Sequence, residues 1–241
     1  MKHVVKPCDA LAQDQWSMLY LAVARKLVDT FQMEGRGAVR EGVRQYAAAL
    51  ARERKAALLD SGCKTNLETL FADGFGFPCG ERSRKEWVRN TEQELFLTVA
   101  QCPYADVWGA QDPELGRMFC EEYYPVLVHE GTSEKAQINL GLCMLNGRDE
   151  CCRLSFYLRP ANVSAEKRAE CFPDFDIAHT KDAELPPYTV DYGEWKLRLL
   201  SSLRNAAAER IGSSGAAAVC AAAQSYATEQ NDAAVLNYLK G

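Results

Sequence analysis

Cysteine is the residue type in this sequence that could carry the most chemistry. The chain has ten cysteines and only three histidines. Half of the cysteines fall between Thr98 and Pro160, at Cys102, Cys120, Cys143, Cys151 and Cys152. A thiolate near cationic or polar donors can act as a nucleophile or a metal ligand, whereas a buried thiol behaves as a small apolar side chain. The segment Thr98–Pro160 is therefore where we look for a site.

The cysteine spacing leaves a metal site open. Three or four converging sulfurs would suit zinc, and Cys102, Cys120 and Cys152 are the ligands we consider. The absence of a Cys-x-x-Cys pair disfavours a thiol-based redox protein. The sequence also lacks Gly-x-Ser-x-Gly and His-Glu-x-x-His, which weighs against two large classes of hydrolase. His179, with two aspartates nearby, is a further acid/base candidate.

The elements that must position these cysteines are a strand, a helix and a β-hairpin. Leu95, Leu97 and Val99 alternate with Phe96, Thr98 and Ala100, a period-two pattern that predicts a strand, which Cys102-Pro103 ends. Asp112-Pro113-Glu114 predicts a helix start, and this helix should run at least to Tyr124. In residues 136–143 and 152–159, apolar side chains recur at every second position. These two segments flank a turn at Asn146-Gly147 and are predicted to form a β-hairpin. Asp106 falls between strand and helix and is predicted to lie in a loop.

Side-chain parity separates the two adjacent hairpin cysteines. Cys152 shares a strand face with Leu154 and Phe156, while Cys151 shares the other with Arg153, Tyr157 and Arg159. If the leucine face packs on the predicted helix, Cys152 points towards Cys120, and we expect these two sulfurs to meet in one enclosed chamber.

Four other side chains could build a pocket around the sulfurs. Trp108 and Tyr124 could form its walls, and Arg159 could bind a carboxylate bidentately. Asn139, on the polar face of a hairpin strand, would need a partner or ligand if covered. A solvated charge at a strand end explains Arg159 equally well.

Helices are predicted on both sides of this segment. Residues 11–32 carry an apolar stripe that includes Trp16 and Tyr20, the Gly-containing 34–37 breaks the helix, and 38–59 form a second one. Arg36, Arg40 and Arg44 share one face of the second helix and could bind a carboxylate, or form a solvated face. Residues 192–211 predict a third helix. The alanine-rich residues 216–239 predict a fourth, which could pair two copies as a homo-oligomer.

The expected fold class is α+β. An antiparallel sheet with the central strand-helix-hairpin unit is packed by N- and C-terminal helices. We expect a single domain over 1–241, with a helical N-terminal part (1–60), an α+β core (82–160) and C-terminal helices (190–241).

Charge and hydropathy exclude some partners. The net charge of -5 argues against a general nucleic-acid binder. The N-terminal residues have no apolar export signal, and no run approaches the length of a membrane span. We therefore expect a cytoplasmic protein, bound neither to nucleic acid nor to membrane, whose partner is a small-molecule substrate.

Several of these segments resemble one protein family. CPYADVW (102–108), LGRMFCEEY (115–123), Asn139-Leu140 and GRDECCR (147–153) are similar to the L-2-amino-thiazoline-4-carboxylate hydrolase family. More distantly, a helical cysteine followed by a hairpin with glycine and cysteine looks like vinyl-reductase-type ligand-binding domains, some of which hold zinc. The doubled Cys151-Cys152 departs from the family pattern, since counting from Gly147 favours Cys151 and strand alternation favours Cys152.

The first resemblance implies a hydrolase acting on a carbon–nitrogen bond of a small cyclic amidine or thiazoline. Carried over, Cys120 would be the nucleophile or a metal ligand, Cys152 its partner, and Asp106 a proton-transfer group. The second resemblance implies the alternative, a non-catalytic binding domain with a structural zinc. No cofactor is certain under either, and zinc is the one that could be present.

Overall fold

The computed structural model describes residues 9–178 and 183–240. The chain divides into two compact units, each made of segments distant in the sequence. Unit 1 comprises the chain up to Tyr46, Pro103–Glu122, and the chain from Val190 onward; unit 2 comprises Ala47–Cys102 and Tyr123–Thr189. Helices α1 (Ala10–Asp60) and α4 (Pro113–Gly131) contribute to both units. The single domain expected from the sequence stays a prediction.

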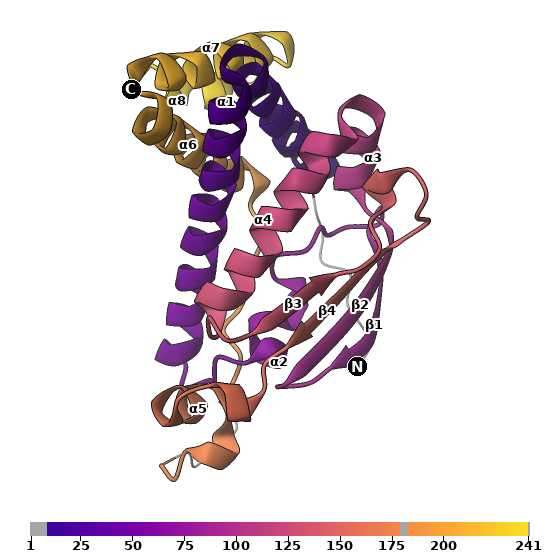
Figure 1. The fold of residues 1–241 in the computed structure, drawn as a ribbon, viewed down its shortest axis with the longest axis vertical. Coiled ribbons are helices and arrows are strands. Elements are labelled where there is room, and N and C mark those ends of the chain that lie inside the picture. Colours follow the sequence, from indigo (N-terminus) through magenta and orange to yellow (C-terminus); the bar gives the residue numbers. More distant parts are fainter. Residues whose placement is uncertain (1–8, 179–182, 241) are drawn as a thin grey trace. The chain divides into compact units, whose positions relative to one another are not determined.

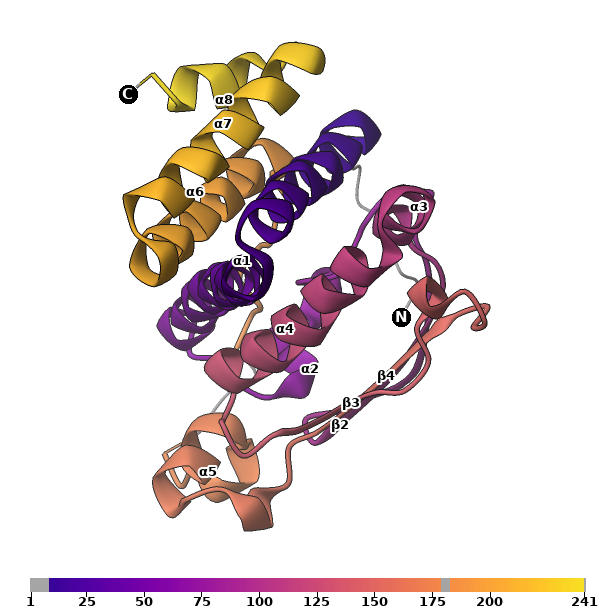
Figure 2. The same ribbon diagram turned by 45° about the horizontal axis from the view of Figure 1, so that its top comes forward.

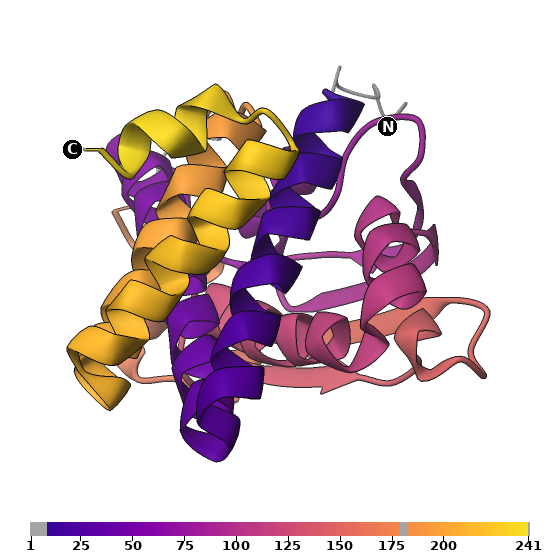
Figure 3. The same ribbon diagram turned by 90° about the horizontal axis from the view of Figure 1, so that it is seen from above.

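Unit 1 is helical and is built around an aromatic core. Its elements are the first part of α1, α3 (Pro103–Gln111), the start of α4, α6 (Tyr192–Ile211), α7 (Ser213–Glu229) and α8 (Ala233–Tyr238). Figure 3 shows α6 and α7 side by side next to the N-terminal part of α1. The predicted stripe is buried at Trp16, Tyr20, Val23 and Leu27. Trp16 contacts five rings of the unit at centroid distances of 4.8–6.3 Å, those of Tyr104, Phe119, Trp108, Tyr46 and Tyr192.

Helix α1 is two helices joined at a sharp break, visible in Figure 2. The break lies at Gln32, whose φ of 51° is left-handed, and not at the glycines of 34–37. Gly35 and Gly37 lie within the second helix. A Cβ on Gly35 would overlap the backbone carbonyl of Leu27, so glycine is required for the close approach of the two segments. The prediction of two helices is confirmed, and the position of the break is corrected.

The C-terminal residues form two helices, so the single helix predicted for 216–239 is wrong. Helix α7 ends at Glu229, and Asn231 follows with a left-handed φ of 52°. Asp232 then caps α8, accepting the Val235 N–H at 3.2 Å. The same carboxylate forms a buried ion pair with Lys196 of α6.

Helix α3 corrects the loop expected after the first predicted strand. Pro103 opens this helix, and Asp106 lies in its first turn. Proline at the first helical position is favoured because its missing N–H would have no helical partner there. Asp106 is therefore a helical residue, exposed to solvent.

Unit 2 contains a four-stranded antiparallel sheet in the order β1-β2-β4-β3 (Figure 1). The strands are β1 (Arg84–Asn90), β2 (Glu94–Gln101), β3 (Gln137–Leu140) and β4 (Cys152–Tyr157). β3 and β4 form the predicted hairpin, and the αL conformation of Gly147 (φ 69°) fits the predicted turn. The expected α+β class is confirmed.

One face of the sheet forms the core of unit 2. Leu97, Leu154 and Phe156 are buried on this face. The Phe156 ring stacks on Phe71 at 5.3 Å and lies 6.4 Å from Tyr124 of α4. The remaining elements of the unit are α2 (Leu67–Leu70), α5 (Ala165–Cys171), and the short 3-10 turns η1 (Ala72–Gly74), η2 (Met144–Asn146), η3 (Pro160–Asn162) and η4 (Pro173–Phe175). In neither described range, 9–178 or 183–240, does a helix have the length and apolarity to cross a membrane.

Candidate functional site

The site that we single out lies where the hairpin narrows in unit 2, and we call it the hairpin neck: Cys143, Met144, Asp149 and Cys152. The chain leaves β3, forms the turn η2 and returns into β4 at Cys152. The backbone N–H of Met144 donates a hydrogen bond to the Cys152 sulfur at 3.4 Å. An N–H directed at a sulfur stabilises negative charge on it, which is what a nucleophilic thiolate needs.

Strand register decides which face Cys152 occupies. Cys152 is paired with Val99 of β2, and residues directly opposite in a ladder carry their side chains on the same face. Val99 is buried, as are Leu154 and Phe156 along β4. The predicted parity is confirmed: the Cys152 side chain belongs to the core-facing side at the end of the sheet. The residue as a whole is half-buried.

Asp149 holds the turn that supplies this N–H. One of its carboxylate oxygens accepts the Cys143 N–H at 2.9 Å and the side-chain amide of Asn146 at 3.1 Å. The two donors flank Met144 on both sides of the chain. A charged acceptor strengthens both hydrogen bonds, so Asp149 fixes the orientation of the Met144 peptide towards Cys152. Sequence reasoning did not single out Asp149, although an Asn-Gly turn followed by aspartate was a signal for such a turn.

Two other cysteines of unit 2 are poor nucleophiles because they are buried. Cys63 is 6% exposed, its thiol donates towards the carbonyls of Ala183 and Glu184, and burial raises its pKa. Cys171 is fully buried; burial raises its pKa, and the nearby Glu170 acts in the same direction. Both therefore stay as neutral thiols at neutral pH.

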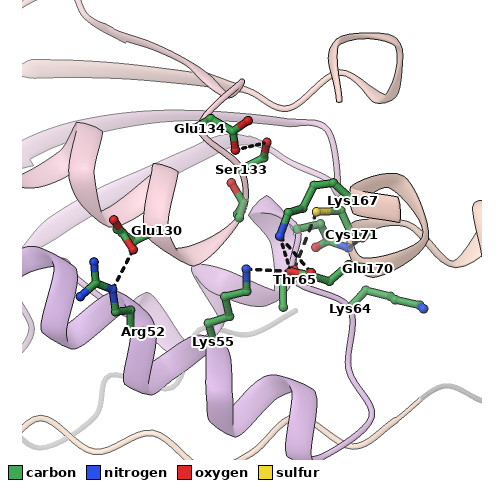
Figure 4. Close-up of polar contacts among 12 residues, drawn as sticks. Arg52, Lys55, Lys64, Thr65, Glu130, Ser133, Glu134, Lys167, Glu170 and Cys171 are labelled. Carbon is green, nitrogen blue, oxygen red and sulfur yellow. Dashed lines mark hydrogen bonds and ion pairs between the residues drawn. The ribbon is translucent and has the colours of Figure 1, made fainter. Parts of the chain in front are cut away.

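Cys171 belongs to a polar cluster that the sequence analysis missed, drawn in Figure 4. Glu170 accepts from Thr65 at 3.1 Å and forms ion pairs with Lys55 at 2.7 Å and Lys167 at 2.9 Å. Thr65 also contacts the Cys171 sulfur at 3.7 Å. Burial raises the pKa of Glu170, but the hydrogen bonds from the two lysines outweigh it and lower that pKa below the usual value. The cluster ties α5 to the end of α1 and has a structural role.

The remaining residues proposed for catalysis or pocket walls lie in unit 1. Cys120 is half-buried on α4; burial, and next the proximity of Cys120, raise the pKa of Tyr20. Trp108 is fully buried, and its indole N–H donates to the Ser17 carbonyl at 3.1 Å. Asp106 is exposed on α3. Trp108 is thus part of the unit 1 core, and the roles assigned to all three stay predictions.

The proposed substrate-binding residues of unit 2 are spread over both faces of its sheet. Asn139 is exposed and pairs in register with Ser155, on the face opposite Cys152. Arg159 is exposed at the end of β4, with its guanidinium 5.7 Å from the centre of the Tyr157 ring. Tyr124 is 8% exposed and stacks on Phe77 at 5.2 Å. The structure does not bring Asn139 or Arg159 to the Cys152 face, and substrate binding by all three stays a prediction.

Among the residues that the structure describes, no group of three or more His, Cys, Asp or Glu side chains is arranged to hold a metal ion. Cys120 belongs to unit 1, whereas Cys102, at the end of β2, and Cys152 belong to unit 2. The zinc considered for these sulfurs stays a prediction. His179 and Cys8 lie outside the described residues.

The chain was compared with protein families, curated proteins and solved structures. No curated protein and no solved structure was found to match the chain. The family model described as L-2-amino-thiazoline-4-carboxylic acid hydrolase matches residues 15–156. The match includes the complete hairpin neck and leaves out Arg159, Glu170 and Cys171. Because it covers more than half of the sequence, the chain belongs to the L-2-amino-thiazoline-4-carboxylic acid hydrolase family.

Proposed function

We propose that the protein is a hydrolase that opens the ring of 2-amino-thiazoline-4-carboxylate or a closely related cyclic amidine, with Cys152 as the nucleophile. Family membership supports the reaction class. The observation that carries the choice of residue is the Met144 N–H directed at the Cys152 sulfur, within the family-matched segment. Cys63 and Cys171 lack this combination, because both are buried with raised pKa values.

The reaction is addition followed by elimination at one carbon. The thiolate adds to the ring carbon between sulfur and nitrogen, forming a carbon–sulfur bond while the C=N electron pair moves onto nitrogen. The ring nitrogen takes a proton and leaves as an amine with the electron pair of the carbon–nitrogen bond. Water then adds to the same carbon, and expulsion of the enzyme thiolate releases S-carbamoyl-cysteine. One water is consumed, and the enzyme is regenerated.

Protonation of the ring nitrogen decides which bond breaks. Thiolates are better leaving groups than unprotonated amines, so carbon–nitrogen cleavage needs a general acid at that nitrogen. The resemblance made Asp106 a proton-transfer group and Cys120 the nucleophile or a metal ligand; both belong to unit 1, and these roles stay predictions. Cleavage of the carbon–sulfur bond instead would give N-carbamoyl-cysteine with a free thiol.

The proposal also covers the redox compartment of the protein and the kind of ligand that it binds. The nine cysteines of residues 9–178 and 183–240 form no disulfide bond, which supports work in a reducing compartment such as the cytoplasm. The ligand that we propose is a small molecule, in keeping with the family to which the chain belongs.

The test is incubation of purified protein with 2-amino-thiazoline-4-carboxylate, followed by product identification by mass spectrometry and by a thiol reagent. We expect S-carbamoyl-cysteine and no new free thiol. Release of a free thiol would overturn the carbon–nitrogen assignment while leaving a hydrolase. No turnover, together with stoichiometric zinc in the protein, would overturn the enzyme proposal in favour of a non-catalytic binding domain. Turnover that persists in Cys152→Ser would overturn the choice of nucleophile.

A further inference from the structure

Unit 1 contains a groove that the proposed hydrolase chemistry does not use. It lies between the second segment of α1 and the end of α6 and has a volume of about 380 Å³. This volume is within the usual range of small-molecule sites. Its charged lining consists of three arginines and two glutamates: Arg40, Glu41, Arg44, Glu209 and Arg210. None of these residues belongs to the hairpin neck.

The groove exists because two small residues leave room for it. Gly37 and Ala206 complete the lining. A Cβ on Gly37 would overlap the guanidinium of Arg210, so a larger residue there would push this side chain away from α1. Nearby, Gly42 allows the same approach, since a Cβ there would lie 2.8 Å from the Leu203 Cα. The close crossing of α1 and α6 thus sets the groove between their charged side chains.

Carboxylates hold the three guanidinium groups in place but leave them donors to spare. Glu122 accepts from Arg40 at 3.2 Å and from Arg44 at 2.5 Å, and Glu34 accepts from Arg210 at 2.8 Å. A guanidinium carries five N–H donors, and each of these pairs uses one nitrogen of the group. The Nε of Arg40 is buried and has no hydrogen-bond partner among the described residues. The Arg40 and Arg44 side chains are 42% and 46% exposed, so their remaining donors can meet an acceptor supplied from outside the chain.

The charge of the surroundings selects the chemical class of that ligand. Glu41 and Glu209 line the same groove as the arginines, and Glu122 and Glu34 form ion pairs with these arginines. Together these side chains provide four negative and three positive charges, so a multiply charged anion would be repelled. A ligand that carries both a carboxylate and a cationic nitrogen can satisfy both kinds of side chain at once.

We propose that this groove binds a small zwitterion of the amino-acid type, with its carboxylate at Arg40 and Arg44 and its cationic nitrogen at Glu41 and Glu209. The inference does not rest on the proposed hydrolase function, since every residue it uses belongs to unit 1. The ion pairs are partly exposed, which predicts weak, salt-sensitive binding in the range of about a millimolar Kd.

The experiment follows the Arg40 Nε–H signal by nuclear magnetic resonance while the full-length protein is titrated with L-methionine, butanoate or butylamine. Butanoate and butylamine each carry one of the two charged groups of the zwitterion. We expect L-methionine to shift the signal and to bind at least about tenfold more tightly than either of the other two. Equal binding of butanoate would overturn the zwitterion in favour of a simple anion site. No shift with any probe would overturn the site itself.

Variants locate the binding within the groove. Glu209→Gln keeps the size of the side chain and its ability to accept from Gln45, which now contacts Glu209 at 3.0 Å. We expect it to weaken L-methionine binding severalfold and to leave butanoate binding unchanged or stronger. Arg204→Ala removes an exposed arginine of the same helix outside the groove, and should leave binding unchanged. Loss of binding in Arg204→Ala, or none in Glu209→Gln, would contradict the assignment.

Discussion

The backbone N–H of Met144 lies 3.4 Å from the sulfur of Cys152 and donates a hydrogen bond to it. This contact distinguishes Cys152 from its neighbour Cys151, which lies just before the first residue of β4. It is supplied by a 3-10 turn, so the donor is part of the backbone and does not depend on a mobile side chain. The proposed nucleophile is therefore set by the conformation of the hairpin.

Asp149 should control the reactivity of Cys152 through that turn. Asp149→Ala removes the acceptor of the Cys143 N–H and of the Asn146 amide, so the Met144 peptide is no longer fixed. We expect the rate of Cys152 alkylation by iodoacetamide to fall about tenfold, and turnover with it. Glu150→Ala, at the exposed neighbouring residue, is the control and should alkylate at the wild-type rate. Equal rates in both variants would contradict a positioning role for Asp149.

Glu170 should stabilise unit 2 in a pH-dependent way. The hydrogen bonds of Lys55 and Lys167 outweigh burial and lower the pKa of this carboxyl from its usual value of 4.5. A carboxyl with a lowered pKa in the folded state stabilises fully above its unfolded pKa, and that stabilisation disappears as the pH falls through the folded value. Glu170→Gln should thus lower the free energy of unfolding by about 1–2 kcal/mol at pH 7, and by progressively less in acid.

Urea titrations at pH 7 and in the acid range measure this difference. Glu166→Gln, an exposed glutamate on the same helix, provides the control and should change stability little at either pH. A Glu170→Gln effect of the same size throughout would show that the lysine contacts are not its source.

Gly35 and Gly37 should respond to different degrees to the same substitution. At Gly35 the added methyl meets the rigid backbone carbonyl of Leu27, whereas at Gly37 it meets the flexible Arg210 side chain. Alanine favours a helix over glycine by up to about 1 kcal/mol. We expect Gly35→Ala to destabilise the protein by about 3 kcal/mol or more, and Gly37→Ala to be close to neutral. Thermal unfolding of the two variants measures this, and similar melting temperatures would contradict the packing described for α1.

The ion pair of Lys196 and Asp232 should be sensitive to loss of one partner. Both side chains are only 4% exposed. Removing one charge leaves the other buried, which costs about 3–5 kcal/mol, whereas removing both is far milder. Lys196→Met should therefore unfold at much lower denaturant concentration than wild type, and adding Asp232→Asn should recover part of the loss. A double variant less stable than Lys196→Met would argue against coupling between the two.

Local sequence signals predicted the regular elements well. Apolar alternation identified β2 and the hairpin, and Asp112-Pro113-Glu114 identified the start of α4. Helix α3 was missed because Cys102-Pro103 was interpreted only as the end of a strand. Pro103 in fact occupies the same kind of position as Pro113, at the start of a helix. The Asn231-Asp232 break was missed for a similar reason, since the alanine-rich composition hid a turn and a helix cap.

Features that depend on tertiary contact were not readable from the sequence. Gly35 was interpreted as a helix breaker, but it lies inside a helix because another backbone segment passes close to it. Trp108 was assigned to a pocket wall, yet it is buried among other aromatic rings. Asp149 acts through backbone groups, whose positions no side-chain pattern encodes. Strand parity, in contrast, did separate Cys152 from Cys151, because alternation is a local property of a strand.

The most direct test of the central claim compares the turnover of 2-amino-thiazoline-4-carboxylate by Cys152→Ser and Cys151→Ser. The two variants differ by one position in the chain and make the same chemical change. The account predicts that Cys152→Ser loses activity by about 10³-fold or more, while Cys151→Ser stays within about threefold of wild type. An active Cys152→Ser, or a selective loss in Cys151→Ser, would contradict it.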